Sequence, residues 1–323
     1  MEYTTLGSTG MTVSRICLGC MSFGTDREWK LTQEESAEII ERALDLGINF
    51  FDTANVYSKG ESERIVGNVL SDYDRDRLVV ATKVYGEMDE TNPNASGLSR
   101  KAIEQELANS LERLGMDTID LYQTHRWDYN TPIEETLRTL DDAVRRGTVR
   151  YLGASSMWAY QFAKALYTSE ALGLNRFATM QNHYNLLYRE EEREMLQLCQ
   201  ETGIGVIPWS PLAKGYLARP HNQLEATTRG ETEDYTQTHP YFQGNGQAIN
   251  ERVQELSDEK GVSMAQISFA WHLHKSGVDA PIVGVTTVEQ LEEAVEALDI
   301  TLSEADLTYL EEPYRPVPPS GHE

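Results

Sequence analysis

Four polar side chains stand at or just after the ends of apolar segments that have the composition of buried β-strands. Asp52, Lys83 and His125 each end such a segment, and Tyr57 lies on the loop that follows Asp52. Burying an unpaired ammonium is costly, so a lysine in this position needs a partner. Asp52 on the neighbouring strand would supply it. Taken singly, each residue has a structural alternative, since Asp52 could cap a loop and Tyr57 is one of 16 tyrosines.

The chemistry available to this set is general acid catalysis. A free tyrosine hydroxyl has a pKa of about 10, too high for easy proton donation at neutral pH. The ammonium of Lys83 should favour the phenolate and lower the pKa of Tyr57, which makes it a competent acid. His125 could donate a hydrogen bond to a carbonyl oxygen and orient the substrate. The set therefore suits reduction of a carbonyl group, with the hydride coming from a cofactor, because no side chain supplies one.

The pattern of the whole chain predicts how these side chains meet. Short β-rich apolar runs alternate with helical patterns, which is typical of a parallel sheet with crossover helices. Eight strands are expected, the number that closes a (β/α)8 TIM barrel, and catalytic residues of such barrels lie at the C-terminal ends of the strands. The expected strands span residues 15–18, 49–52, 78–82, 118–123, 151–154, 178–181, 205–208 and 281–284.

Capping signals place helices between these strands. A capping box at residues 32–35 precedes a helix that ends at Gly47. Further helices are expected to begin at Ser99, Pro132 and Ser263, and the first two of these to end at Gly115 and Gly147.

Two segments stand outside the alternation. Residues 1–14 predict a small β-hairpin that turns at residues 8–10. Residues 212–246, after the seventh strand, are polar and rich in Thr, Gly and His, and a connection of this length is usually a lid or a binding loop. We therefore expect residues 1–323 to form a single barrel domain, with an N-terminal hairpin and one long loop on its catalytic face.

Composition narrows the classes of function. The 52 acidic residues against 28 Lys and Arg give a net charge of −24. No basic cluster is present, which argues against nucleic-acid binding, and no apolar run approaches the roughly 20 residues of a membrane span. The N-terminus lacks the pattern of a secretory signal, so a cytoplasmic protein is expected. Cys17 and Cys20 would point to opposite faces of a strand, so we expect neither a metal site nor a disulfide framework.

The charge balance also favours a salt-rich cytoplasm. Only 8 of the 28 basic residues are lysine. Self-repulsion on this scale destabilises a compact chain in dilute buffer, and it becomes tolerable in molar salt, where the Debye length falls to about 3 Å. A halophilic protein is therefore expected, with an ordinary acidic protein as the alternative.

The order of Asp52, Tyr57, Lys83 and His125 on successive strands resembles the catalytic tetrad of the aldo-keto reductase superfamily. Blocks at residues 19–24, 153–156, 181–186 and 208–215 agree with this family, and the match spans almost the whole chain. The chain is most similar to the long-loop microbial branch, which is related to potassium-channel β-subunits and to a bacterial reductase associated with 1-deoxyxylulose 5-phosphate formation. The resemblance implies a nicotinamide cofactor across the barrel mouth without a Rossmann fold.

The resemblance also implies which residues would hold that cofactor. Ser155, Ser156 and Gln181 would bind the nicotinamide carboxamide, and Trp209 would stack on the nicotinamide ring unless it only packs against an edge strand. Ser210, Leu212, Lys214 and Gly215 would contact the pyrophosphate, and Gln290 and Glu293 the adenosine end. The remaining expected contacts are Gly19, Cys20, Met21, Asp52, Pro211, Gly284, Thr286 and Thr287.

One position departs from the family pattern. Relatives that prefer NADPH often carry an arginine where this chain has Thr287, and arginine pairs with a 2′-phosphate in a fork geometry. Lys214 or Arg219 could compensate. We expect NADPH as the cofactor, with NADH as the alternative.

The substrate is expected to be a small aldehyde or ketone. Phe23, Tyr85 and Trp127 follow strand ends and would line its pocket together with Tyr57 and His125, with core packing as the alternative for the first three. A rival function is a cofactor-binding regulatory subunit of the channel β-subunit type. An isomerase or hydrolase on the same barrel is a third reading, which the absence of metal-ligand spacing disfavours.

Overall fold

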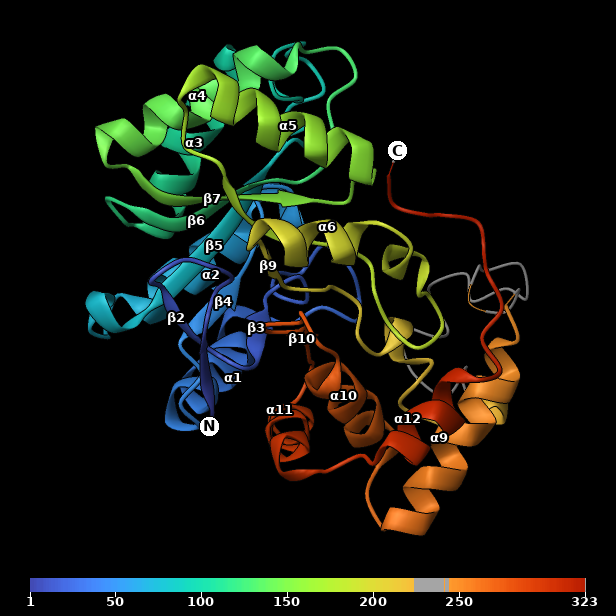
Figure 1. Ribbon diagram of the computed structural model, residues 1–323. Helices are drawn as coiled ribbons and strands as arrows, with labels where there is room; N and C mark the ends of the chain where they lie inside the picture. Colours follow the sequence, from blue (N-terminus) through green and yellow to red (C-terminus); the bar gives the residue numbers. More distant parts are fainter. Residues whose placement is uncertain (224–240, 242–243, 323) are drawn as a thin grey trace.

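The computed structural model describes residues 1–223, 241 and 244–322, and its centre is a ring of eight parallel strands (Figure 1). The sheet order is β10-β3-β4-β5-β6-β7-β8-β9. The ring closes between its two ends, because the amide of Asp279 donates to Val206 O and that of Ile282 to Pro208 O, each over 2.9 Å. The strands are β3 (Cys17–Gly19), β4 (Phe50–Asp52), β5 (Val79–Val84), β6 (Ile119–Thr124), β7 (Val149–Ser155), β8 (Phe177–Gln181), β9 (Gly205–Val206) and β10 (Ile282–Gly284).

These observations confirm the predicted (β/α)8 barrel. All eight expected strands are present, and each observed bound lies within two residues of the predicted one. Parallel pairing places the C-terminal ends of the strands on one side of the ring, as the register of Gly19 opposite both Asp52 and Gly284 shows. Asp52 and Lys83 lie in the last residues of β4 and β5 on that side, and Tyr57 and His125 follow β4 and β6.

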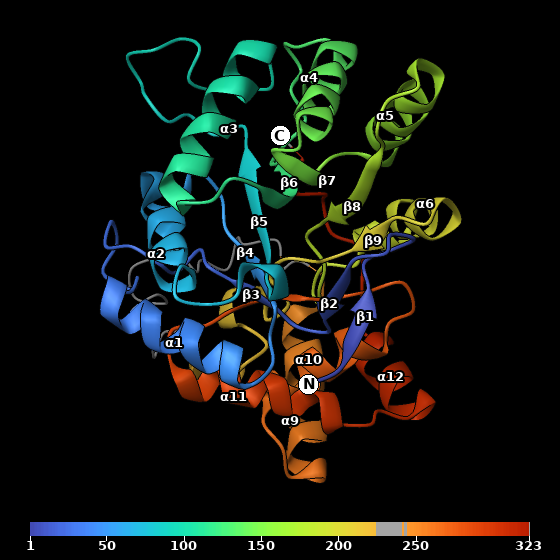
Figure 2. The ribbon, with the colours of Figure 1, turned by 90° about the vertical axis from the view of Figure 1, so that its left-hand side faces the viewer.

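Helices cover the outside of the ring (Figure 2). The predicted caps are present: Thr32 forms a capping box with Glu35, and Ser99 and Ser263 accept bonds from the first turns of their helices. Pro132 lies one residue before its helix, at the N-cap. The helices are α1 (Gln33–Asp45), α2 (Glu61–Leu70), α3 (Arg100–Leu114), α4 (Ile133–Arg146), α5 (Ala159–Leu172), α6 (Met195–Thr202), α9 (Gly246–Lys260), α10 (Met264–His274), α11 (Val288–Glu296) and α12 (Glu304–Glu311).

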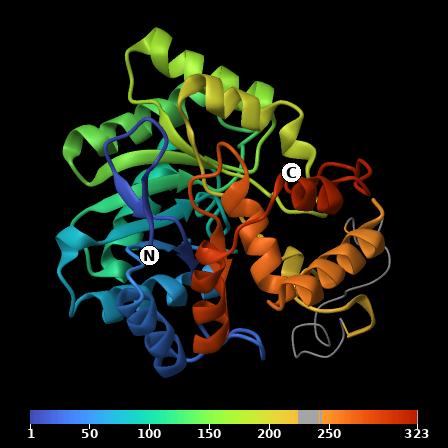
Figure 3. The same cartoon turned by 60° about the horizontal axis from the view of Figure 1, so that its bottom comes forward.

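The N-terminal hairpin closes the barrel at the end opposite the catalytic residues (Figure 3). Its antiparallel strands β1 (Tyr3–Thr5) and β2 (Thr12–Ser14) confirm the predicted hairpin. The amide of Ser8 donates to Gly203 O just before β9, and the amide of Gly7 donates to the Asp279 carboxylate just before β10, each over 2.8 Å. Beneath the hairpin lies a second apolar cluster, formed by Leu6, Val13, Cys17, Phe50, Val79, Ala81, Leu121, Ile207, Ala280 and Ile282.

The C-terminal segment runs to the opposite side of the molecule and ends near α5 (Figure 1). There Ser320 N donates to the Tyr188 hydroxyl over 3.0 Å, and the Tyr129 hydroxyl donates to His322 O over 3.3 Å. The long loop was predicted at residues 212–246, and most of it lies outside the described residues. In the part that is described, no helix is long and apolar enough to cross a membrane.

Candidate active site

Lys83 lies at the centre of a buried polar cluster at the C-terminal ends of β4 and β5. Its ammonium is 2.5 Å from the Asp52 carboxylate, and it donates to Thr53 O over 2.9 Å and to the Tyr57 hydroxyl over 3.2 Å. The side chains of Lys83 and Asp52 are both almost fully buried. The structure thus brings together the lysine, its expected partner and the candidate acid.

Asp52 is fixed by more than the lysine. Its second carboxylate oxygen accepts from Gln123 Nε2 over 2.8 Å and from Gln181 Nε2 over 2.9 Å. Gln181 also donates to Gln123 Oε1 over 3.1 Å. Sequence reasoning missed Gln123. The signal was present, because a glutamine inside a fully buried strand requires polar partners.

Tyr57 begins a short 3-10 turn, Tyr57–Gly60, whose backbone is held in an unusual conformation. Ser58 and Lys59 have φ of 48° and 50°, and Gly60 has φ of 88°. Non-glycine residues in the left-handed region cost free energy that the surroundings must offset. Here the Ser58 hydroxyl donates to Phe23 O over 2.9 Å and accepts from Lys30 Nζ over 2.9 Å. The turn therefore holds Tyr57 in place.

His125 completes the set from the end of β6. Its ring lies edge-on to that of Tyr57, with centroids 5.8 Å apart and planes at 80°. The imidazole and the phenol thus lie next to each other at the C-terminal ends of the strands.

Burial controls the protonation of these groups. Burial lowers the pKa of Lys83, but Asp52 and Tyr57 outweigh it and raise that pKa above its usual value, so Lys83 stays charged. Burial raises the pKa of Tyr57, and Lys83 only partly opposes this. The expectation that Lys83 brings the pKa of Tyr57 below its usual value is therefore wrong for this structure. Burial, aided by Lys83 and Arg126, holds the pKa of His125 well below its usual range, so His125 is neutral at pH 7.

The residues expected to hold a carboxamide and a nicotinamide ring lie at the ends of β7 to β9. The Ser155 hydroxyl donates to Gln181 O over 2.8 Å and lies 3.0 Å from that of Ser156. Ser156 accepts from Trp209 Nε1 over 3.1 Å. One face of the Trp209 ring stacks on His183, with centroids 4.2 Å apart. A bound ring would therefore have to use the other face of Trp209.

The segment after β9 has the form of an anion-binding turn. Ser210, Ala213, Lys214 and Gly215 have φ of 61°, 49°, 59° and 92°. Backbones of this kind turn successive N–H groups toward one side, which makes a concave site for phosphate. Lys214 is exposed on this turn, Pro211 is buried, and Leu212 is half-buried.

The expected adenosine end lies at the start of α11. Thr287 is the N-cap of this helix and accepts from Gln290 N over 3.3 Å. Gln290 Oε1 in turn accepts from Thr286 N over 2.9 Å. A helix N-terminus favours anions, and Thr287, Glu289 and Gln290 are exposed there while Glu293 is half-buried.

The other residues expected to contact the cofactor or the substrate differ in how exposed they are. Gly284 is exposed beside Gly19, where a side chain on Gly19 would crowd Ile282. Cys20 is fully buried and its amide donates to Asp52 O, whereas Met21 is 38% exposed and available for contact. Phe23 is fully buried among core side chains, which is the packing alternative rather than an open pocket wall.

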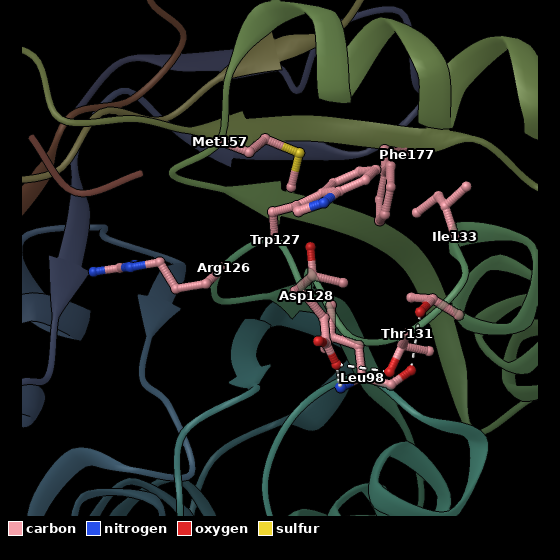
Figure 4. A pocket seen from close by; sticks show the side chains of 10 residues that line it. Leu98, Arg126, Trp127, Asp128, Thr131, Ile133, Met157 and Phe177 are labelled. Atoms are coloured by element: carbon pink, nitrogen blue, oxygen red, sulfur yellow. Dashed lines mark hydrogen bonds between the residues drawn. The ribbon is translucent and has the colours of Figure 1, made fainter. Parts of the chain in front are cut away.

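Tyr85 and Trp127 are half-buried. Trp127 lines a small cavity with Leu98, Met157 and Phe177 (Figure 4). The same cavity includes Thr124, one residue before His125 on the chain. Trp127 thus shares a cavity with the two residues on either side of His125, Thr124 and Arg126. Within the described residues no group of three His, Cys, Asp or Glu could hold a metal ion.

Comparison with known proteins identifies the family. The model of the aldo/keto reductase family matches residues 15–315. The chain is 44% identical to a Schizosaccharomyces pombe protein whose name assigns it provisionally to the aryl-alcohol dehydrogenases, over 99% of this chain and 97% of that protein. It is 42% identical to an aldo-keto reductase of Fusarium vanettenii, over 100% and 93%. It is also 42% identical to the versiconal hemiacetal acetate reductase of Aspergillus parasiticus, over 98% of each. The chain belongs to the aldo/keto reductase family and is an oxidoreductase.

Proposed function

We propose that the protein reduces an aldehyde or ketone to an alcohol with a hydride from NADPH, and that Tyr57 is the general acid. The observation that carries the proposal is the position of Lys83 Nζ, which lies within hydrogen-bonding distance of both the Asp52 carboxylate and the Tyr57 hydroxyl. An ammonium is a donor only, so the bond from Lys83 uses a lone pair of the Tyr57 oxygen. The O–H of Tyr57 is then available to the substrate oxygen.

The protonation states support the same division of roles. His125 is neutral at pH 7 and has one N–H to offer, so it would polarise and orient the carbonyl. Tyr57 stays protonated at this pH because its pKa is raised. A phenol remains a stronger acid than the product alcohol, so proton transfer to the developing alkoxide is favourable. The proton thus moves from Tyr57 to the carbonyl oxygen, and Lys83 stabilises the phenolate that remains.

The chain offers groups that fit a nicotinamide dinucleotide. The left-handed turn at residues 210–215 and the N-terminus of α11 provide two anion-binding features on the catalytic side. When bound, the reduced nicotinamide supplies the hydride. Ser155, Ser156 and Trp209 would hold its nicotinamide end, Lys214 and Gly215 its pyrophosphate, and Gln290 and Glu293 its adenosine. NADPH is the proposed cofactor, with NADH accepted as well because Thr287 carries no charge.

The proposal extends to the setting of the protein. We place it in a salt-rich cytoplasm, on the net charge of −24 and the small share of lysine. One of the relatives carries a name that refers to aryl alcohols, so aromatic aldehydes are the first substrates to test.

The test is a screen for turnover in molar KCl. The purified protein is mixed with NADPH or NADH and a series of aromatic and aliphatic aldehydes and ketones, and loss of the reduced cofactor is followed together with formation of the alcohol. We expect stoichiometric alcohol formation with at least one carbonyl class. Tight cofactor binding without turnover across the series would instead favour a regulatory subunit of the channel β-subunit type.

A further inference from the structure

Arg126 directly follows His125 and stands beside the catalytic groups. Its guanidinium donates to the carbonyl oxygen of His125 over 2.7 Å, and the side chain is half-buried. In Figure 4 this side chain extends away from the cavity that Trp127, Met157 and Phe177 enclose. Arg126 still belongs to the lining of this cavity, although its guanidinium points away from the other lining side chains. The guanidinium is bonded to the backbone of His125, whose ring lies edge-on to that of Tyr57 with centroids 5.8 Å apart.

The pKa shifts agree with this position of Arg126. Burial lowers the pKa of Arg126, while Tyr57 and Tyr85 both raise it. Reciprocally, Arg126 acts to lower the pKa of Tyr57. Because it is bonded to the backbone oxygen of His125, the guanidinium lies next to the residue that would orient the substrate carbonyl.

Within the described residues Arg126 has no carboxylate partner, in contrast to Arg113 and Arg189. Arg113 pairs with Glu63 over 2.5 Å, and Arg189 pairs with Glu192 over 2.7 Å. Within the described ranges, the guanidinium of Arg126 donates one hydrogen bond, to the carbonyl oxygen of His125. Arg126 lacks a carboxylate partner in the described residues although the chain has 52 acidic residues against 28 basic ones. A guanidinium has five N–H donors, so most of the donors of Arg126 are available to another molecule.

The arrangement of these donors determines which kind of ligand Arg126 can bind. Planar guanidinium binds carboxylate and phosphate oxygens in pairs of parallel hydrogen bonds, and lysine cannot reproduce this geometry. A chain with a net charge of −24 repels anions at long range. A local positive charge beside the reacting atoms would offset that repulsion for a substrate that is itself anionic.

We propose that Arg126 binds an oxyanionic group of the substrate, so that the enzyme prefers carbonyl compounds that carry a carboxylate or a phosphate within reach of the carbonyl. The inference rests on the proposed reductase function and names the class of its substrate. Arg126 would be a specificity-determining residue, distinct from the four groups that act on the carbonyl itself.

Matched substrate pairs test this preference. The carboxylate arm compares 3- and 4-carboxybenzaldehyde with their methyl esters, and the phosphate arm compares 4-formylphenyl phosphate with 4-methoxybenzaldehyde. In each arm we compare the anionic substrate that the wild type reduces best with its neutral partner. We expect kcat/KM for the anionic substrate to be about ten- to a hundredfold higher, mainly through a lower KM. The arm with the larger ratio identifies whether carboxylate or phosphate is the natural group.

Variants of Arg126 assign the preference to this residue. Arg126→Met should bring the anion-to-neutral ratio down to about one, and Arg126→Lys should retain part of it because charge remains without the fork. Arg138→Met removes the same charge from an exposed position on α4 and serves as the control for long-range electrostatics. It should keep the wild-type ratio. An equal fall in kcat for charged and neutral substrates in Arg126→Met would overturn the proposal, since it would mean that Arg126 only adjusts Tyr57.

A binding measurement separates this inference from the proposed reaction. Benzoate is titrated into the cofactor complex of the Tyr57→Phe variant, with and without Arg126→Met, and circular dichroism checks that both proteins are folded. We expect benzoate to bind about tenfold or more weakly when Arg126 is replaced. Equal affinities would contradict the role of Arg126, whatever the Tyr57 variant does to turnover.

Discussion

The Lys83 ammonium donates to the Tyr57 hydroxyl over 3.2 Å, and this bond fixes the direction of the phenol proton. Because Lys83 occupies a lone pair of the Tyr57 oxygen, the O–H must point away from Lys83. Burial nevertheless raises the pKa of Tyr57 despite this ammonium. In the proposed reaction the pair keeps the phenol protonated before the proton is transferred, and Lys83 stabilises the phenolate once the proton has left.

The first prediction concerns pH. In the proposed reaction reduction requires protonated Tyr57, so activity should be present below its pKa in the folded protein and should be lost as the pH rises through it. Since that pKa is raised above the usual value of about 10, kcat for reduction should stay level across neutral pH and fall only in strongly alkaline buffer. A pH–rate profile of kcat checks this. A fall centred near pH 7 would assign the proton to another group.

The second prediction concerns the buried ion pair. Lys83→Met leaves the Asp52 carboxylate buried without its cation, which typically costs about 3–5 kcal/mol of stability. It also removes the charge that stabilises the phenolate, so kcat should fall by about a hundredfold or more. The double variant Asp52→Asn/Lys83→Met removes both charges and should recover much of the melting temperature without recovering turnover. Full activity of Lys83→Met at pH 7 would show that Lys83 and Tyr57 are not coupled.

The third prediction concerns the choice of cofactor. The wild type should discriminate weakly between NADPH and NADH, and Thr287→Arg should lower the Kd for NADPH by about tenfold while changing that for NADH little. Thr287 also caps α11, so losing its hydroxyl should cost about 1 kcal/mol of stability. Thr287→Ala is the matched control, because it loses the cap without adding a charge.

The titrations of NADPH and NADH belong at the lowest salt at which the protein is folded, since salt screens an exposed ion pair. A wild-type preference for NADPH of about a thousandfold would mean that another basic residue binds the phosphate.

The fourth prediction concerns salt. A net charge of −24 should make the melting temperature and kcat rise from dilute buffer toward molar KCl, as the repulsion between surface carboxylates is screened. Thermal unfolding at a series of KCl concentrations measures this. NaCl at the same ionic strength should act similarly if screening is the cause. A melting temperature that is level or falls over the range would remove the halophilic interpretation.

The sequence predicted the barrel because each of its strands is a short apolar run bounded by readable turns and caps. It also predicted that Asp52 and Lys83 meet, since a charge at the end of a buried strand requires a partner. Gln123 was missed although a glutamine inside a buried strand signals a need for polar partners, and only the folded barrel shows that its partner is Asp52. The stack of Trp209 on His183 could not be predicted, because it depends on neighbours that come together only in the folded barrel.

The local backbone conformation beside Tyr57 could not be predicted from the sequence either. Ser58 and Lys59 adopt left-handed backbones without being glycine, and contacts from Phe23 and Lys30, far back in the chain, hold Ser58 there. The net direction of the pKa of Tyr57 was predicted wrongly, because the sequence shows the neighbouring charge but not the depth of burial.

The most direct test of the account is single-turnover reduction by the Tyr57→Phe variant. The phenyl ring preserves the packing against His125 and removes only the hydroxyl that Lys83 contacts. With saturating NADPH and an aromatic aldehyde in molar KCl, we predict a rate constant at least about a hundredfold below wild type, with the Kd for NADPH nearly unchanged. Retention of more than about a tenth of the wild-type rate would contradict the assignment of Tyr57 as the acid.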